Sequence, residues 1–295
     1  MDVRVGSAPD SWGVWFPDDP KQTPWHRFMD EIAEAGYEWT ELGPYGYLPT
    51  DLSTLQAELE KRGLKVSGTF AMDHLEDPAS WGTLEEQVLG AGESLASLGA
   101  EYLVLIDDVY TDLFTGESQR PDRLDESEWK RLIDTTHKVA DIARDQFGLQ
   151  LVYHHHADTH VDYDDQIEAF LEQTDPSRVS LCYDTGHHAY RGGDPVDFMR
   201  RHHERIPYLH LKSIDAKIRE RVEAENIPFA TAVGMDMFVE PSEGAVDFLA
   251  FRDVLRNIDY NGFAIVEQDM YPASFDKPFP IAKRTRAYLR EIGIG

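Results

Sequence analysis

Residues 179–212 read VSLCYDTGHHAYRGGDPVDFMRRHHERIPYLHLK, and this stretch contains two short apolar runs separated by a helical segment. The runs Val179–Asp184 and Tyr208–Lys212 have the length and residue types of buried strands. The segment Pro195–His203 between them has the amphipathic pattern of a helix that crosses back over a sheet. A strand, a helix and a second strand in this order predict a parallel β-α-β unit.

The same alternation extends over the whole chain of 295 residues. It predicts eight strands, at Val3–Ala8, Glu38–Leu42, Lys65–Phe70, Tyr102–Ile106, Leu149–His154, Val179–Asp184, Tyr208–Lys212 and Phe263–Glu267. Amphipathic helical segments lie between them, at Thr23–Ala35, Leu52–Arg62, Leu84–Leu98, Glu126–Phe147, Asp164–Gln173, Pro195–His203 and Val246–Asn257. No linker divides the chain and no Gly-rich nucleotide-binding turn follows the first strand. The sequence therefore predicts a single (β/α)₈ TIM barrel over residues 1–295 rather than a doubly wound sheet.

The composition limits the classes of partner. The chain has 28 Lys+Arg against 55 Asp+Glu, a formal net charge of −27 at pH 7, which opposes binding to nucleic acids and anionic membranes. The single cysteine, Cys182, cannot form an intramolecular disulfide, and no apolar run approaches the ~20 residues that span a bilayer. We expect a cytoplasmic protein without a nucleic-acid or membrane partner.

Histidines gather at the ends of the predicted strands. Nine of the 12 histidines lie between positions 154 and 210, and the carboxyl ends of barrel strands form the active-site face of a TIM barrel. In the run YHHHADTH (153–160), strand alternation places His154 and His156 on one face and His155 on the other. We expect His154 and His156 to be functional, and His155 and His160 to be structural.

Three later strands end in residues that bind metals. Asp184 ends the sixth predicted strand, His210 lies in the seventh and Glu267 ends the eighth. Carboxylates and imidazoles that converge from several strands are typical of a divalent-metal site. Glu267 would bind a metal or transfer a proton. The sequence thus predicts a metal site at the mouth of the barrel.

Three further side chains have two interpretations each. Gly186 allows the chain to bring His187 back to the same site, where it would act as an acid or a base or bind substrate. Lys212 is either a cation that polarises the substrate or half of a buried ion pair. Glu41 ends the second predicted strand and either binds substrate or faces the surrounding helices.

Aromatic residues gather around the ends of the first strands, among them Trp12, Trp15 and Tyr45. Apolar rings beside polar groups suit the faces and hydroxyls of a sugar or polyol, so we expect these three residues to contact substrate. The alternative is that they pack in the barrel core.

Six motifs along the chain together resemble one superfamily. They are GSAPDSWG (6–13), TELGPYGYLP (40–49), YHHHADTHV (153–161), CYDTGHH (182–188), YLHLKS (208–213) and IVEQD (265–269). The set is similar to the xylose isomerase-like superfamily of sugar phosphate isomerases and epimerases, whose members are TIM barrels. Within it the motifs are most similar to those of the inosose (2-keto-myo-inositol) dehydratase group, which shares the ELGPxGY segment, the His-rich fifth strand and the DTGH sequence.

The resemblance implies one divalent metal ion, held by Glu, Asp, His and Glu from strands five to eight. By position, Asp184, His210 and Glu267 match the last three ligands, and His154 stands where many relatives have Glu. An imidazole there favours Mn²⁺, Co²⁺ or Zn²⁺ over Mg²⁺. The acid of the common HLKD pattern is Ser213 here, which leaves the hydrogen-bond partner of His210 open.

The resemblance also implies an activity, a metal-dependent lyase that acts on a cyclic keto-polyol or keto-sugar. A base, His156 or His187, would remove the α-proton, and an acid would help to expel the β-substituent. The leaving group would be water, as in inosose dehydratases, or the aglycone of a 3-oxo-glucoside, as in C-glycoside deglycosidase-like proteins. The latter work with a small partner subunit, and related barrels commonly form homo-oligomers. The alternatives are a sugar phosphate isomerase or epimerase and a non-catalytic sugar-binding barrel.

Overall fold

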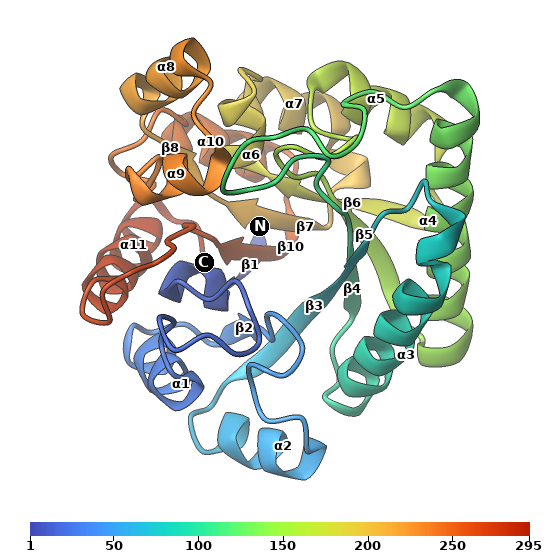
Figure 1. Cartoon of the computed structure of the whole chain (residues 1–295). Helices are drawn as coiled ribbons and strands as arrows, with labels where there is room; N and C mark the ends of the chain where they lie inside the picture. Colours follow the sequence, from blue (N-terminus) through green and yellow to red (C-terminus); the bar gives the residue numbers. More distant parts are fainter.

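The computed structural model describes residues 1–295 and contains a closed barrel of parallel strands in the order β1-β10-β7-β6-β5-β4-β3-β2 (Figure 1). These strands are β1 (Asp2–Ser7), β2 (Trp39–Glu41), β3 (Lys65–Asp73), β4 (Tyr102–Asp107), β5 (Gln150–His154), β6 (Val179–Asp184), β7 (Tyr208–Leu211) and β10 (Asn261–Val266). The predicted (β/α)₈ barrel is confirmed, and each predicted strand coincides with one strand of the barrel. The largest shift is in β3, which runs on to Asp73 instead of ending at Phe70.

Helices surround the barrel (Figure 1). They are α1 (Trp25–Glu34), α2 (Leu52–Glu60), α3 (Trp81–Ser97), α4 (Glu126–Phe147), α5 (Asp164–Gln173), α6 (Thr185–Tyr190), α7 (Pro195–His202), α8 (Ala216–Glu225), α9 (Phe229–Gly234), α10 (Phe248–Asn257) and α11 (Pro278–Ile292). Three single turns of 3₁₀-helix are η1 (Pro9–Trp12), η2 (Pro78–Ser80) and η3 (His203–Arg205). The seven helical segments expected from the sequence correspond to α1–α5, α7 and α10.

Aspartates begin many of these helices, which accounts for part of the acidity of the chain. A carboxylate at the N-cap accepts hydrogen bonds from the free backbone N–H groups of the first turn. Six aspartates cap helices α2, α4, α6, α7, α8 and α10 in this way, namely Asp51, Asp125, Asp184, Asp194, Asp215 and Asp247. Six of the 55 acidic residues therefore serve helix formation.

The apolar interior of the barrel lies directly beneath a polar layer. One buried cluster fills the barrel, and on β5, β6, β7 and β10 it includes Val152, Cys182, Tyr208 and Ile265. Successive side chains of a strand point to opposite faces, so the inward position recurs after two residues. The next inward residues along these strands are His154, Asp184, His210 and Glu267. The strand geometry alone thus places these four polar residues at one level above the apolar core.

An insertion after β7 covers one side of the barrel mouth. It contains α8, α9 and a two-stranded antiparallel sheet of β8 (Ser213–Ile214) and β9 (Phe238–Val239). A separate apolar cluster includes Phe229 and Phe238, which bring aromatic rings to the histidines at the mouth. This sheet has no counterpart among the eight strands predicted from the sequence. None of the helices combines the length and apolar character that crossing a membrane requires.

Gly6 of β1 lies where two strands approach closely. A Cβ atom there would be 2.7 Å from the backbone oxygen of Trp39 and 2.8 Å from Ile265 Cδ1. We expect Gly6→Ala to lower the free energy of unfolding by about 1–3 kcal/mol, because the backbone of β2 cannot move away without disturbing the barrel. Urea unfolding measures this change.

Gly90, within α3, provides the matched control because a Cβ there meets nothing within 4 Å. We expect Gly90→Ala to raise the free energy of unfolding by about 0.5–1 kcal/mol, because alanine restricts the unfolded chain and favours the helix. Equal effects of the two substitutions would contradict the packing argument.

Candidate metal centre and active site

Four buried side chains converge at the ends of β5, β6, β7 and β10. One nitrogen or oxygen atom of each of His154, Asp184, His210 and Glu267 lies within 4.8 Å of those of the other three. Two imidazoles and two carboxylates in one small group form a donor set for a divalent transition metal. The structure therefore brings together the four residues that the sequence analysis expected to be ligands.

Asp184 divides its two carboxylate oxygens between a helix and this group. Its Oδ1 accepts hydrogen bonds from the backbone N–H groups of Gly186 (2.7 Å) and His187 (2.8 Å) and so caps α6. Its Oδ2 is buried and has no hydrogen-bond partner. A Cβ at residue 186 would be 2.3 Å from Lys212 Cγ, so this turn requires glycine. The arrangement leaves one oxygen of Asp184 facing the other ligand candidates.

Glu41 fixes the orientation of the His210 ring. The Nε2–H of His210 donates to Glu41 Oε1 at 2.9 Å, and the hydroxyl of Tyr208 donates to the same oxygen at 2.8 Å. The other ring nitrogen, Nδ1, has no hydrogen-bond partner and lies 3.0 Å from Glu267 Oε2. A carboxylate behind a ligand histidine sets its tautomer and raises its basicity. The acid of the HLKD pattern is Ser213 in this chain, so the hydrogen-bond partner of His210 was left open by the sequence. The structure shows that this partner is Glu41, which we had expected to bind substrate.

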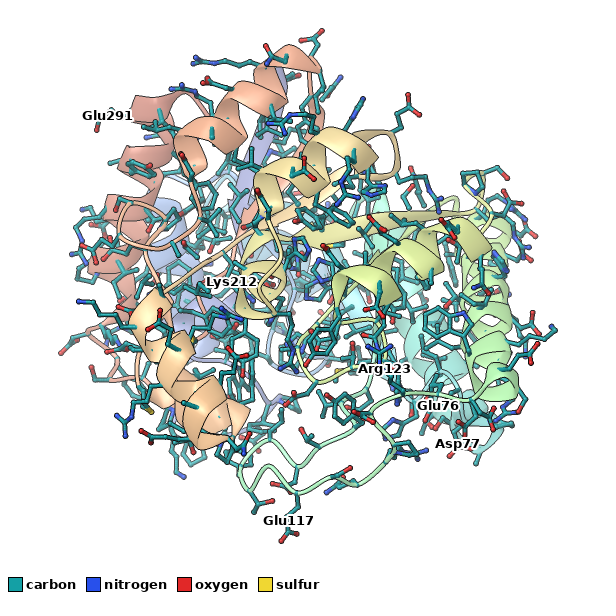
Figure 2. The ribbon with its side chains drawn as sticks, turned by 90° about the horizontal axis from the view of Figure 1, so that it is seen from above. Glu76, Asp77, Glu117, Arg123, Lys212 and Glu291 are labelled. Carbon is teal, nitrogen blue, oxygen red and sulfur yellow. The ribbon has the colours of Figure 1, made fainter.

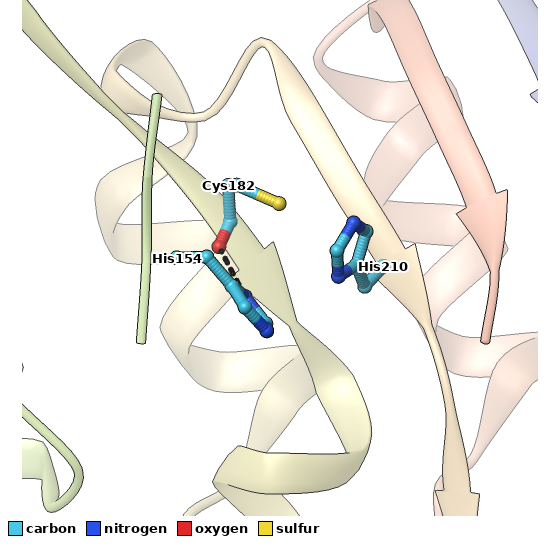
Figure 3. A group of neighbouring side chains, drawn as sticks. All are labelled: His154, Cys182 and His210. Carbon is cyan, nitrogen blue, oxygen red and sulfur yellow. Dashed lines mark hydrogen bonds between the residues drawn. The ribbon is translucent and has the colours of Figure 1, made fainter. Parts of the chain in front are cut away.

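His154 presents its Nε2 to the group. Its Nδ1 lies 3.5 Å from the carbonyl oxygen of Cys182, a long hydrogen bond that makes Nδ1 the protonated nitrogen (Figure 3). Burial lowers the pKa of His154 well below its usual value, and the neighbouring His210 adds to the effect. The ring is therefore neutral at physiological pH, the form that binds metals.

Cys182 offers a second possible group, since its sulfur lies close to the rings of His154 and His210 (Figure 3). Burial raises the pKa of the Cys182 thiol to about 12, so the thiol stays protonated. The thiolate, not the thiol, binds metal ions. The group with Asp184 and Glu267 is therefore the better metal site, and Cys182 belongs to the apolar interior.

Lys212 lies in the middle of the barrel, whereas residues such as Glu117 and Glu291 lie at the periphery (Figure 2). The Lys212 Nζ atom is 2.8 Å from Asp269 Oδ2 and 3.1 Å from a carboxylate oxygen of each of Asp184 and Glu267. Burial disfavours the charge of Lys212, but these carboxylates outweigh it and raise its pKa well above the usual value. Of the two interpretations of Lys212, the structure shows the buried ion pairs.

The cavity above these residues has a volume of about 330 Å³. Aromatic and aliphatic side chains form its walls, among them Trp15, Phe16, Phe70, Met72, Val104, Ile106 and Phe229. Its polar lining consists of Asp10, Glu41, Asp108, His154, His156, His210, Lys212, Glu267 and Asp269. This mixture of an apolar wall and a few converging polar groups is typical of a small-molecule site.

His156 and His187 differ in their access to the cavity. His156 lines it, and its Nδ1–H donates to the Ala157 carbonyl at 2.8 Å, which leaves Nε2 with a free lone pair. His187 is fully buried and lies behind Lys212, whose Nζ donates to His187 Nε2 at 3.0 Å. Burial lowers the pKa of both histidines. The structure therefore places His156 in the lining of the cavity and His187 outside it.

Two of the three expected aromatic contacts lie elsewhere. Trp12 is a core residue, because its indole N–H donates to Glu31 Oε2 at 2.9 Å and its ring packs against Phe28. Tyr45 is 75% exposed and lines a neighbouring cavity. Only Trp15 lines the cavity above the metal centre, where its ring stacks on Tyr271. Contact of Trp15 with a substrate stays a prediction.

Three acidic residues of the cavity were not among the candidates from the sequence, namely Asp10, Asp108 and Asp269. Asp269 stands two residues after Glu267, and strand alternation continued past the end of β10 could have indicated it. Asp10 lies in the turn η1, which has no such periodicity. Its position could not be inferred from spacing.

The two histidines expected to be structural do form structural contacts. His155 accepts a hydrogen bond from the backbone N–H of Asp184 at 3.1 Å. His160 uses both ring nitrogens, one with Asp107 Oδ2 at 2.7 Å and the other with the Pro121 carbonyl at 3.1 Å. His160 also lies near Glu76 and Asp107 in a possible second ligand group, but neither of its nitrogens is free.

The chain matches known proteins over most of its length. Residues 29–292 match the family model described as "Xylose isomerase-like TIM barrel". The chain is 35% identical to an inosose dehydratase of Geobacillus kaustophilus (98% of this chain, 94% of that protein) and 31% identical to one of Clostridium beijerinckii (98% and 97%). Among solved structures, the IOLI protein with a binding zinc atom superposes with a TM-score of 0.72 at 17% identity, over 97% of this chain and 98% of that one.

The hydrogen bond from His210 to Glu41 can be tested through metal affinity. We expect Glu41→Gln to weaken the binding of Mn²⁺ or Co²⁺ by about 10- to 100-fold, because the neutral amide orients and polarises the ring less strongly. Competition with a chromogenic chelator measures the dissociation constant. Glu38→Gln is the control, since Glu38 is exposed and three residues earlier in the chain. Equal affinities for all three proteins would contradict this role of Glu41.

Proposed function

The chain belongs to the xylose isomerase-like TIM barrel family, and from this premise we propose that it is a divalent-metal-dependent dehydratase acting on a cyclic keto-polyol, with 2-keto-myo-inositol as the first candidate. The observation that carries the proposal is the group of His154, Asp184, His210 and Glu267 at the floor of a partly apolar cavity. The two inosose dehydratases support the choice of reaction and substrate.

The charges of the cavity favour a neutral substrate. Its lining contains five carboxyl groups, those of Asp10, Glu41, Asp108, Glu267 and Asp269. The only lysine or arginine in the lining is Lys212, which is already paired with carboxylates. A phosphate group would meet no free cation here and would be repelled by the carboxylates. We therefore favour an uncharged polyol over a sugar phosphate.

The residues present fit a bound metal ion. Asp184 Oδ2 and His210 Nδ1 are buried and make no hydrogen bond, and they lie 3.1 Å from Lys212 Nζ and 3.0 Å from Glu267 Oε2, so both atoms belong to one charged group that an ion can join. His154, Asp184, His210 and Glu267 would hold the ion, and the mixed nitrogen and oxygen donors favour Mn²⁺ or Co²⁺, with Zn²⁺ next and Mg²⁺ last. When bound, such an ion supplies a Lewis acid for the ketone oxygen and stabilises the negative charge that develops there.

His156 is the residue best placed to remove the α-proton. Its free Nε2 lone pair faces the cavity, and burial keeps the ring neutral by lowering its pKa. Asp269 would orient the substrate, and Trp15 would exclude water from one face of its ring. The elimination then needs an acid for the leaving hydroxyl. Because His154 is a neutral ligand candidate and not a carboxylate, the fifth strand offers no carboxylate base for an epimerase.

The reaction can be tested by incubating the protein, purified without chelator, with 2-keto-myo-inositol. We expect a product that has lost one water, seen by mass spectrometry, and about one metal ion per chain. Chelator treatment should abolish the reaction, and Mn²⁺ or Co²⁺ should restore it better than Mg²⁺. A product of the same mass as the substrate would instead show an epimerase, and an unchanged substrate would exclude 2-keto-myo-inositol.

A substitution separates the roles of the two candidate histidines. We expect His156→Gln to lower kcat by about 10²- to 10⁴-fold, the usual contribution of a general base, with metal content unchanged. His187→Gln should have the smaller effect, because His187 contacts Lys212 and not the cavity. His26→Gln is the control, because His26 is exposed on the surface and the same substitution there should leave kcat unchanged. Full activity of the His156 variant would contradict the assignment.

A further inference from the structure

Asp10 has a free carboxyl oxygen inside the cavity. It follows β1 in the turn η1, where its Oδ1 accepts a hydrogen bond from the backbone N–H of Ser11 at 2.8 Å. This contact fixes the orientation of the carboxyl group. The second oxygen, Oδ2, is buried and has no hydrogen-bond partner. Asp10 is thus held rigidly by one oxygen while the other remains available to a bound molecule.

Asp10 is also the one carboxyl group of the cavity without a basic partner. The other pairs are Glu41 with His210 (2.9 Å), Asp108 with His74 (3.7 Å), Glu267 with Lys212 (3.1 Å) and Asp269 with Lys212 (2.8 Å). A buried carboxylate without a cation is unfavourable, and the usual outcome is that the group keeps its proton. Burial raises the pKa of Asp10 well above its usual value, and the charges of Glu267 and Asp269 add to this effect.

The protons of the other candidate donors are already engaged. Lys212 donates to His187 and is paired with several carboxylates. The Nδ1–H of His156 is engaged by the Ala157 carbonyl, and the Nε2–H of His210 by Glu41. A protonated carboxyl group at Asp10 would be a donor without such a partner.

We propose that Asp10 is the general acid that protonates the leaving hydroxyl group. The proposal rests on the dehydratase function stated above and names the residue that completes its chemistry. His156 first takes the α-proton, and the C–H electron pair is held as the enolate of the ketone. As the carbonyl re-forms, the enolate electrons make the new carbon–carbon double bond, and the C–O electron pair leaves with the β-oxygen. That oxygen takes the proton of Asp10 and departs as water. Asp10 then takes a new proton from solvent, and His156 releases the α-proton to solvent.

Asp10→Asn separates this role from proton abstraction. Asparagine keeps the shape and the hydrogen bond to Ser11 but cannot deliver a proton. We expect dehydration of 2-keto-myo-inositol to fall by about 10²- to 10⁴-fold. The exchange of the α-hydrogen with deuterium from D₂O, followed by NMR, should persist, because this exchange needs His156 and not Asp10.

A second substrate tests the need for the proton directly. In an analogue with fluorine in place of the β-hydroxyl, the leaving group departs as fluoride and needs no acid. We expect Asp10→Asn to eliminate fluoride at a rate within about tenfold of the unchanged protein, so the defect should be confined to the hydroxyl substrate. A merely structural role of Asp10 would slow both substrates equally.

Asp73→Asn is the matched control. Asp73 is the last residue of β3, and its Oδ1 accepts from the N–H of the next residue at 2.8 Å, but it does not line the cavity. The role of Asp10 would be overturned if Asp10→Asn dehydrated the substrate at the full rate, or if exchange, fluoride release and dehydration fell equally. Either result would leave the proposed function standing. Absence of both exchange and dehydration in the unchanged protein would overturn the proposed function as well.

Discussion

The alternation of side chains along parallel strands that are locked in a closed barrel is the constraint on which the site depends. Closure fixes the register of β5, β6, β7 and β10, with His154 opposite Cys182 and Asp184 opposite His210. A shift of one residue in β5 would turn His154 outward and His155 inward. The metal centre is therefore a property of the barrel as a whole, since its four ligand candidates come from four strands.

The second constraint is the concentration of negative charge at the barrel mouth. One ammonium group, Lys212, faces the carboxylates of Asp184, Glu267 and Asp269. A divalent cation is the natural complement of this excess, and the same excess explains why a neutral substrate fits better than an anionic one. Asp10 has no cation of its own, and its burial raises its pKa well above the usual value. Metal binding and substrate charge thus share one electrostatic origin.

The sequence was sufficient for the features that follow from periodicity. Strand ends and the inward alternation of His154, Asp184, His210 and Glu267 could be predicted, because a barrel strand repeats after two residues. Features that depend on turns or on contacts across the barrel could not. Glu41 meets His210 from a strand distant in sequence, and Trp12 and Trp15 diverge because the turn η1 sends one ring into the core and the other to the cavity. The sheet of β8 and β9 was missed because two-residue strands leave no pattern.

Asp184 links the metal centre to the fold itself. The carboxylate that caps α6 through one oxygen presents the other to the ligand group, so its conformation is set when the helix forms. The side chain of Asp184 is therefore already fixed when an ion binds. The conformational entropy of this side chain is lost during folding and not during ion binding. By the same linkage, an ion at the site would stabilise the junction of β6 and α6 against local opening. Metal occupancy and the rigidity of this side of the barrel would then rise and fall together.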